Sequence, residues 1–366
     1  MIDVASIAYN IASFICALFV LEYGADKFID HTAIVAERTG VPEAIIALLT
    51  AGAEWEELVV VVVCILRHRS SLAVGNIVGS GISNILGAFS LGLVASGRDE
   101  VVFDESAKVY AAMLLLVTCI FTGMNFVGSA TLTRTFGVVL IAVFAFYMAS
   151  VAYLILKGRL TAPESDSDSD SDSDTEDGVD VESVRSSIVG ADAETPLLAT
   201  QRTSGLRHKY GITYHVTFLL LGFLAIVLSG FVLSTAASSV ADQSGTSDVF
   251  LGVVVLSIAT TLPEKFVAVV SGRRNRTGIL VANTVGSNIF LLSLCMGILW
   301  VSTAGTFDKG TVNVIEMGVL LGSTLFMTLI VWFGARWSRL AGMIMLVGYV
   351  AFLVLEFTVI HHGDSS

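Results

Sequence analysis

The sequence has few charged residues and few cysteines, and each shortage excludes a class of protein. Only 14% of its 366 residues are charged while 54% are hydrophobic, and a mean hydropathy of +0.81 is far from the profile of a soluble globular protein. The four cysteines all fall within apolar segments, so they predict neither a disulfide framework nor a metal site. The chain also lacks a G-x-x-x-x-G-K-S/T phosphate loop, which argues against an ATP-driven pump.

Long apolar segments recur along the chain instead. Each is about 20 residues or longer and can cross a hydrocarbon core of ~30 Å as a helix. The first has no basic stretch before it and no small-residue cleavage site after it, so we do not interpret it as a signal peptide. The sequence predicts an all-α polytopic membrane protein with ten transmembrane helices, at residues 5–30, 41–66, 72–96, 107–127, 131–156, 212–240, 248–271, 277–302, 312–334 and 339–359.

A long polar stretch at 158–211 divides these segments five and five. Of the net charge of −12, residues 161–200 contribute twelve acidic residues against one basic residue. Ser and Asp alternate from Ser165 to Asp174, a composition that cannot bury enough apolar surface to become ordered. Serines followed by acids also resemble acidophilic-kinase sites, so a kinase is a candidate partner, although a flexible linker is the simpler interpretation. We predict three units: a first membrane repeat at 1–157, a disordered acidic cytosolic loop at 158–211, and a second membrane repeat at 212–366.

The basic residues predict the orientation of the chain. With the acidic loop in the cytosol, the arginines within 273–276 and 336–339 lie on the cytosolic side as well, as the positive-inside rule requires. Arg67 and Arg69 fall on the other side and are a minority violation of the rule. Because five spans separate the halves, equivalent segments cross the membrane in opposite directions. The sequence therefore predicts two inverted five-helix repeats, an architecture in which the substrate site lies near the bilayer midplane.

Two glutamates lie at matched places in the two halves. Glu57 precedes Ser80 by 23 residues. In the second half, 207 residues further on, Glu264 precedes Ser287 by the same interval. A carboxylate within an apolar span is costly, so a matched pair indicates a functional site.

The neighbours of these glutamates are rich in oxygen atoms. Ser80 and Asn84 in the first copy share a helix face, since they are four residues apart. In the second copy Pro263 has no backbone N–H and therefore frees a carbonyl in the turn before it, beside the hydroxyls of Thr260 and Thr261. Carboxylates, carbonyls and hydroxyls are hard ligands that suit Ca²⁺ or Na⁺.

These motifs resemble the two alpha-repeats of the calcium/cation antiporter superfamily, most closely its sodium/calcium exchanger branch. The family pattern G-T-S-x-P-E, followed by G-N-x-x-G-S-N, is matched by Ala259–Glu264 with Ala282–Asn288 and, less fully, by Gly52–Glu57 with Gly75–Ser80. The resemblance implies alternating-access antiport in which the two repeat glutamates bind Ca²⁺ in competition with the counter-ion. It implies cations and the lipid bilayer as partners, with no cofactor, no nucleic acid and no enzymatic activity.

Each copy also departs from the family pattern. In the first, Ala53, Glu54 and Glu56 replace Thr, Ser and Pro. Glu54 is three residues from Glu57 and can face the same cavity, whereas Glu56 lies on the other side of the helix. In the second, Leu291 stands where the family usually has a ligand. One added carboxylate could offset the lost ligand, or two close carboxylates could share a proton and favour proton coupling over sodium coupling.

The sequence therefore predicts a secondary active antiporter that exchanges Ca²⁺ for Na⁺ or H⁺. The alternatives are a dedicated Ca²⁺/H⁺ antiporter, a passive channel, and a non-transporting sensor or scaffold that retains the exchanger fold. An endomembrane such as the vacuole or endoplasmic reticulum is the expected location, with the plasma membrane as the alternative. The candidate ion ligands are Glu57, Glu264, Asn84, Ser80, Thr260, Thr261, Ser287 and Glu54.

Overall fold

The computed structural model describes residues 4–39, 54–97, 101, 103, 105–124, 129–156, 211–307, 310–333 and 335–360. Within these residues every long element is a helix. The N-terminal part of the predicted second span and nearly all of the acidic loop lie outside this part of the chain. The disorder and the kinase sites predicted for the loop are therefore outside the described residues.

The first half of the chain forms a series of apolar helices, of which the third is a long rod with a π-helical middle. Its elements are α1 (Val4–Arg38), α3 (Trp55–Leu66), the rod made of α4 (Ser70–Ile82), η1 (Ser83–Phe89) and α5 (Ser90–Ala95), then α6 (Glu105–Met124) and α7 (Ala130–Leu156).

The second half repeats this order. Its elements are α9 (Ile212–Ser244), a span made of α10 (Asp248–Phe250), η2 (Leu251–Leu256), α11 (Ser257–Thr260) and α12 (Leu262–Arg273), a rod made of α13 (Thr277–Ile289), η3 (Phe290–Cys295) and α14 (Met296–Thr303), then α15 (Val314–Phe333), the short η4 (Ala335–Trp337), α16 (Ser338–Leu355) and η5 (Glu356–Ile360). The span containing α12 bends by 47° at Thr261. Pro263, in the first turn of α12, explains the break because it removes a backbone donor and crowds the preceding turn.

The helices account for nine of the ten predicted spans. Eight are long and apolar enough to cross a membrane, and the bent pair at 248–273 makes a ninth. The described part of the remaining span is α3, with 12 residues, and its predicted beginning lies outside the described residues. Large apolar side chains on the outer helices, such as Phe19 and Phe146, are at least 70% exposed, as expected of surfaces that face lipid. The protein is an integral, multi-pass membrane protein.

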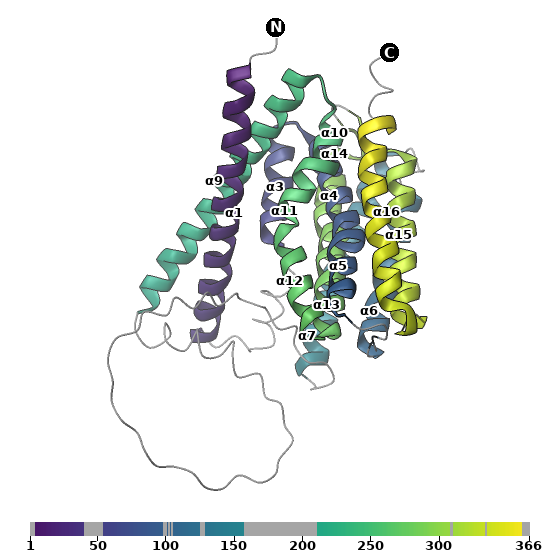
Figure 1. Ribbon diagram of the computed structural model, residues 1–366. Helices are drawn as coiled ribbons and strands as arrows, with labels where there is room; N and C mark the ends of the chain where they lie inside the picture. Colours follow the sequence, from purple (N-terminus) through teal and green to yellow (C-terminus); the bar gives the residue numbers. More distant parts are fainter. Residues whose placement is uncertain are drawn as a thin grey trace, which may run out of the picture.

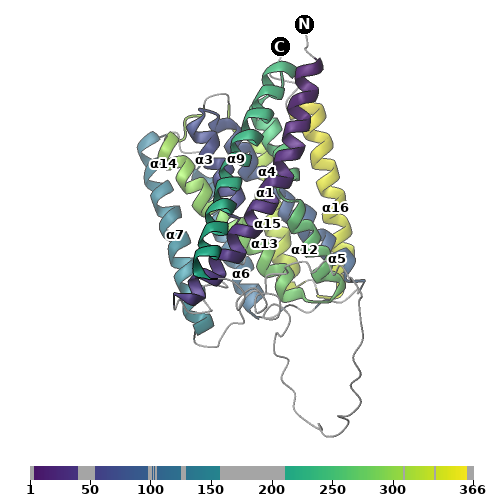
Figure 2. The same cartoon turned by 90° about the vertical axis from the view of Figure 1, so that its left-hand side faces the viewer.

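The packing of the helices shows the inverted repeat. The first helices of the two halves, α1 and α9, lie against each other beside the main bundle (Figures 1 and 2), and the fourth, α6 and α15, also pack together. Contacts between non-equivalent helices occur twice, once in each direction between the halves. Thus α5 packs on α16 while the equivalent α14 packs on α7, and α4 contacts η2 while η3 of the equivalent rod contacts α3. Such pairings are those of two halves related by a pseudo-two-fold axis.

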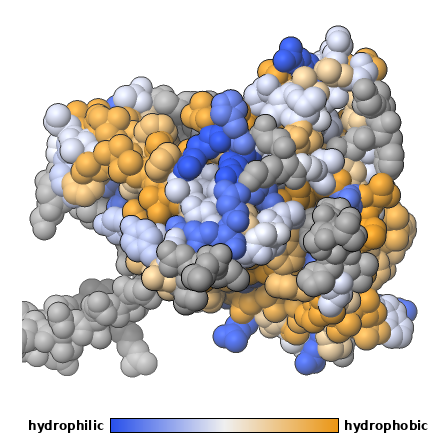
Figure 3. Space-filling model, turned by 90° about the horizontal axis from the view of Figure 1, so that it is seen from above, coloured by the Kyte–Doolittle hydropathy of each residue, from blue (hydrophilic) through white to orange (hydrophobic). Residues whose placement is uncertain are grey.

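The ends of the helices agree with an odd number of spans in each half. The start of α1 and the end of α16 lie at the upper end of the molecule in Figure 1, whereas α7 ends and α9 begins at the lower end. The turn between α12 and α13, which contains the arginines of 273–276, also lies at the lower end. The predicted cytosolic segments therefore share one side. The upper end, seen in Figure 3, carries a cluster of hydrophilic residues between more hydrophobic sides.

Two rods and the bent span form the centre of the bundle. Ser70–Ala95 and Thr277–Thr303 are the most buried of the candidate spans. Glycines bring the rod of the first half against the bent span of the second. A Cβ atom at Gly75 would lie 2.5 Å from the carbonyl oxygen of Val249, and one at Gly79 would collide with the carbonyl of Val253. This close approach brings the motifs of the two halves together.

Candidate cation site

Glu57 is the centre of the polar cluster in the middle of the bundle. It lies in the first turn of α3 and is 1% exposed. Its carboxylate accepts hydrogen bonds from Ser80 Oγ at 2.9 Å, from Thr260 Oγ1 at 2.5 Å and from the amide of Asn76. Ser80 and Asn76 belong to α4, whereas Thr260 belongs to α11 in the other half. One carboxylate therefore ties together three elements and both repeats.

Glu54 lies beside Glu57 and is also buried, at 4% exposed. Asn84, in the π-helical segment η1, donates from Nδ2 to Glu54 Oε1 at 3.5 Å. Ser287 of α13 approaches the same carboxylate from the second half. Glu54, Glu57 and the serine–asparagine pair at 80 and 84 thus share one cavity, as the spacing predicts. Glu56 is half-buried and faces Glu264 and Glu22 of α1 instead.

Glu264 occupies the position equivalent to Glu57 but has a different environment. It lies in the first turn of α12, directly after Pro263, and is half-buried. It is close enough to Glu57 for their charges to interact. Its Oε2 atom is buried and has no hydrogen-bond partner within the described residues. Glu264 therefore borders the cluster around Glu57 without being fixed in it.

Thr261 and Leu291 fall outside the cluster of oxygen atoms around Glu57 and Glu54. The Thr261 hydroxyl is engaged by Ser83 Oγ at 2.9 Å and by Lys265 Nζ at 2.5 Å. Leu291 is fully buried in η3 and supplies no oxygen, as its side chain dictates. Lys265 and Ser83 were not among the sequence-derived candidates, because nothing in the spacing indicates that they meet.

Several buried oxygen atoms around this cluster have no donor. In addition to the Glu264 oxygen, the buried side-chain oxygens of the two motif regions that have no hydrogen-bond partner among the described residues include Glu54 Oε2, Asn76 Oδ1, Asn84 Oδ1 and Asn288 Oδ1. Buried acceptors are normally paired, and all five are acceptors, not donors. Asn288 uses its amide nitrogen to bond Thr284 O at 2.7 Å, and its oxygen lies 3.1 Å from the place of a Cβ atom on Gly81 in the other half.

The ligand set fits a hard cation. Among the described residues, no group of three or more His, Cys, Asp or Glu side chains that could hold a metal ion is found. Carboxylate, amide and hydroxyl oxygens are the donors that Ca²⁺ and Na⁺ take, and Ca²⁺ accepts mixed sets of them. Asn76 and Asn288 extend the set derived from the sequence. Both lie within the quoted glycine-rich motifs, which is the signal that could have identified them.

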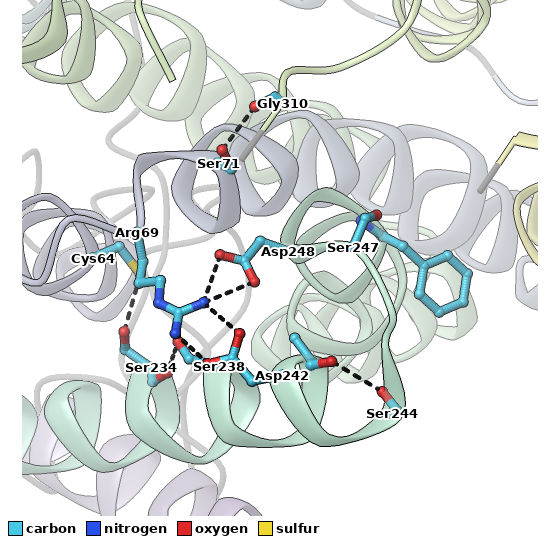
Figure 4. A network of polar contacts seen from close by, with 12 residues as sticks. Cys64, Arg69, Ser71, Ser234, Ser238, Asp242, Ser244, Ser247, Asp248 and Gly310 are labelled. Atoms are coloured by element: carbon cyan, nitrogen blue, oxygen red, sulfur yellow. Dashed lines mark hydrogen bonds and ion pairs between the residues drawn. The ribbon is translucent and has the colours of Figure 1, made fainter. Parts of the chain in front are cut away.

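A second polar network closes the upper end of the bundle. Arg69, in the turn before α4, donates to Asp248 Oδ2 at 3.1 Å and to Asp242 Oδ1 at 3.2 Å (Figure 4). Asp242 belongs to α9 and Asp248 to α10. The hydrogen bond that Arg69 donates to Asp242, together with that to Asp248, raises the pKa of Arg69 above its usual value. The guanidinium therefore stays charged and joins the α1–α9 pair to the main bundle.

The fold defines a membrane transporter of the inverted-repeat type, and a buried cluster of side-chain oxygens lies between its halves. The sequence profile of the sodium/calcium exchanger protein family matches residues 9–153 and 214–358. The chain belongs to this family.

Individual proteins show the same relationship over nearly the whole chain. Sodium/calcium exchanger MaX1 of Methanosarcina acetivorans is 24% identical over 366 residues, which cover 96% of this chain and 99% of MaX1. Among solved structures, native YfkE has a TM-score of 0.65 at 15% identity, covering 97% of this chain and 93% of YfkE. The sodium-calcium exchanger NCX_Mj has a TM-score of 0.56 at 19% identity, covering 97% of this chain and 99% of NCX_Mj. At these identities the two structures show a shared fold.

Proposed function

We propose that this protein is a secondary active antiporter that exchanges Ca²⁺ for Na⁺ or H⁺ by alternating access. The observation that carries the proposal is the set of five buried acceptor oxygens that lack donors among the described residues. A hard cation satisfies several such oxygens at once. Membership of the exchanger family supports the proposal, and so do the names of MaX1 and NCX_Mj, each a sodium/calcium exchanger.

The cation ligands are drawn from both halves. Glu57, Glu54, Ser80 and Asn84 provide the part from the first half, and Thr260, Ser287 and Glu264 the part from the second. Asn76 and Asn288 add amide oxygens. Thr261, which the sequence also suggested as a ligand, is left out of this set because its hydroxyl is bound by Lys265.

Charge balance explains why such a site exchanges ions and does not leak. One Ca²⁺ or two monovalent cations neutralise a pair of carboxylates equally well. A site stripped of ions would keep its charges in a low-dielectric interior, where an unpaired charge is costly. Only forms with ions bound therefore switch easily between opening the site to one side of the membrane and to the other. The protein has two forms, in which the site opens to one or the other side of the membrane. Each ion shifts the equilibrium between them according to the difference in its affinity for the two forms.

The remaining parts of the proposal concern the organisation and the setting of the protein. Residues 1–157 and 212–366 form the two membrane repeats, and 158–211 form an acidic, disordered cytosolic loop. The Ser–Asp alternation in that loop supports phosphorylation by an acidophilic kinase, and the location proposed for the protein is an endomembrane. The plasma membrane is the competing location.

Flux in reconstituted vesicles tests the proposal. Purified protein in liposomes is given radiolabelled Ca²⁺ outside and an outward gradient of either Na⁺ or H⁺. We expect gradient-driven uptake by the wild type and none by Glu264→Gln, because that variant loses one charge of the pair. The matched control is Glu105→Gln, which changes a glutamate that is 88% exposed at the start of α6.

The outcomes separate the candidate functions. Uptake driven by H⁺ alone identifies a Ca²⁺/H⁺ antiporter, and uptake driven by Na⁺ identifies a Na⁺/Ca²⁺ exchanger. Flux that ignores both gradients contradicts antiport and indicates a channel. No flux from a well-folded protein contradicts transport altogether and favours a sensor or scaffold, a reading for which the buried Leu291 is the specific support.

A further inference from the structure

Lys265 places an amine inside the bundle next to Glu264. Its side chain, half-buried in the first turns of α12, reaches into the other half of the molecule. Nζ lies 2.8 Å from Ser83 Oγ, 3.1 Å from the carbonyl oxygen of Thr261 and 2.5 Å from Thr261 Oγ1. Three oxygens therefore surround one nitrogen.

The hydrogen-bond directions identify this nitrogen as a donor in all three contacts. Thr261 Oγ1 gives its single proton to Ser257 O at 2.5 Å, so it accepts from Lys265. Ser83 Oγ then donates to Thr261 and accepts from both Lys265 and Tyr349 OH, which lies 2.9 Å away. The Thr261 carbonyl can only accept. Three donated bonds require an ammonium group, which has three N–H donors and no acceptor.

The surroundings make room for this ammonium. A Cβ atom at Gly87 would come within 3.3 Å of Lys265 Cε and within 3.5 Å of the Tyr349 ring. The aliphatic part of the Lys265 side chain thus occupies space that is open because residue 87 is a glycine. Ser83 and Thr261 are fully buried. The group is held by oxygen atoms in the manner of a bound monovalent cation.

The charge of Lys265 matches the carboxylate that distinguishes the first half. Lys265 interacts with Glu264, Glu54 and Glu57, which are the three carboxylates around the site. Glu54 replaces the uncharged serine of the family pattern, so it adds one negative charge to the glutamate pair. One ammonium offsets one added carboxylate.

Building on the proposed function, we propose that Lys265 is a tethered monovalent cation within the transport site. It fills a cation position formed by Ser83 and Thr261, compensates Glu54, and so sets which ions the site requires. With Lys265 in place, the site exchanges Ca²⁺ without an additional monovalent cation. Without it, a free cation of similar size must bind alongside Ca²⁺.

Chemical rescue tests this role. Lys265→Ala is reconstituted and its Ca²⁺ exchange is measured with choline, K⁺ or methylammonium on the same side as Ca²⁺. We expect the variant to lose at least tenfold in rate in choline, and K⁺ or methylammonium to restore most of the loss. The wild type should respond to neither. The double variant Glu54→Gln/Lys265→Ala should exchange Ca²⁺ in choline, since both charges are removed together.

A second readout does not depend on transport. Ions that bind only the folded state raise its unfolding temperature, so K⁺ should stabilise purified Lys265→Ala and leave the wild type unchanged. Lys108→Ala is the matched control, since Lys108 pairs with Glu105 at the start of α6, and it should behave as the wild type in both assays.

The two proposals fail in different ways. If the wild type shows no gradient-driven Ca²⁺ flux, the antiport function fails, while selective stabilisation of Lys265→Ala by K⁺ still supports the tethered cation. Exchange by Lys265→Ala at the wild-type rate in choline would overturn the inference. So would a folded Lys265→Ala that neither K⁺, methylammonium nor Glu54→Gln restores, because that result indicates a purely structural lysine.

Discussion

The two repeats place the same kind of carboxylate at the same point of the fold and hold it in different ways. Glu57 is almost fully buried and accepts hydrogen bonds from three side chains, one of them from the opposite repeat. Glu264 is half-buried, and its Oε2 has no partner among the described residues. The first carboxylate is therefore fixed by the bundle. The second lies at a proline-induced break and has fewer constraints, as suits a ligand that moves between two exposures.

A second pair of equivalent positions also differs between the two repeats. Glu54 and Thr261 are 207 residues apart and therefore correspond. The first faces Asn84, and the second is bound by Lys265. An acid in one repeat is thus balanced by a base beside its counterpart in the other. The comparison teaches that the repeat supplies the framework, while the ion chemistry depends on residues in which the copies differ.

The largest expected effect comes from removing the fixed carboxylate. Glu57→Gln loses the charge and rearranges the hydrogen bonds from Ser80 and Thr260. If losing one buried carboxylate that pairs with the cation costs about 3 kcal/mol, Ca²⁺ binding weakens by about 100-fold. Glu264→Gln should weaken binding less, by about tenfold, because that carboxylate has fewer bonds to lose. Titration of purified protein with Ca²⁺ measures both, and equal losses would contradict the asymmetry.

The arginine network gives the next largest effect. Arg69→Ala leaves Asp248, 2% exposed, without its charged partner. Breaking a buried ion pair costs about 3 kcal/mol at the low end, so the unfolding temperature should fall by several degrees. The equivalent Arg276 is exposed, and Arg276→Ala should change the unfolding temperature little. Thermal unfolding of the two variants in detergent checks this, and a similar fall in both would mean that the pairing at Asp248 adds no stability.

Exchanging one small residue between the repeats has a smaller effect. Gly75 corresponds to Ala282, and a Cβ at Gly75 would lie 2.5 Å from the carbonyl oxygen of Val249. Gly75→Ala should therefore destabilise the protein by about 1–2 kcal/mol through overpacking. Gly278→Ala is the control, since no atom lies within 4 Å of its added Cβ. Unfolding in increasing denaturant compares them, and unchanged stability of Gly75→Ala would show that the helices separate at no cost.

Restoring the missing ligand should have the smallest effect. Leu291→Asn gives the second repeat the amide that Asn84 provides in the first. A buried amide without a partner costs about 1 kcal/mol or more, and we expect Ca²⁺ to recover that loss by binding the new oxygen. The unfolding temperature with and without Ca²⁺ measures the recovery. A loss that Ca²⁺ leaves unchanged would place residue 291 away from the ion.

Much of this arrangement could be predicted from the sequence, because regular helices convert spacing into position. Residues 57 and 80 meet because they lie on two antiparallel helices that are connected by a short turn. Ser80 and Asn84 share a helix face because they are four residues apart. The bend at Pro263 follows from the missing backbone donor. Packing between helices from different halves has no such rule. The bond of Thr260 to Glu57 therefore required the structure.

The contacts that could not be predicted depend on long or small side chains. Lys265 reaches Ser83 only because Gly87 leaves space for its stem. The oxygen of Asn288 lies next to Gly81 of the other half because the glycine has no side chain to keep it away.

The central claim is that the two repeats build a single cation site. Equilibrium binding of radiolabelled Ca²⁺ to the purified wild type, Glu57→Gln and Glu264→Gln tests it most directly. The account predicts one Ca²⁺ per wild-type chain at saturation and weakened binding of that single ion in each variant. Two Ca²⁺ per chain, with one retained at wild-type affinity in each variant, would show two independent sites and contradict the account.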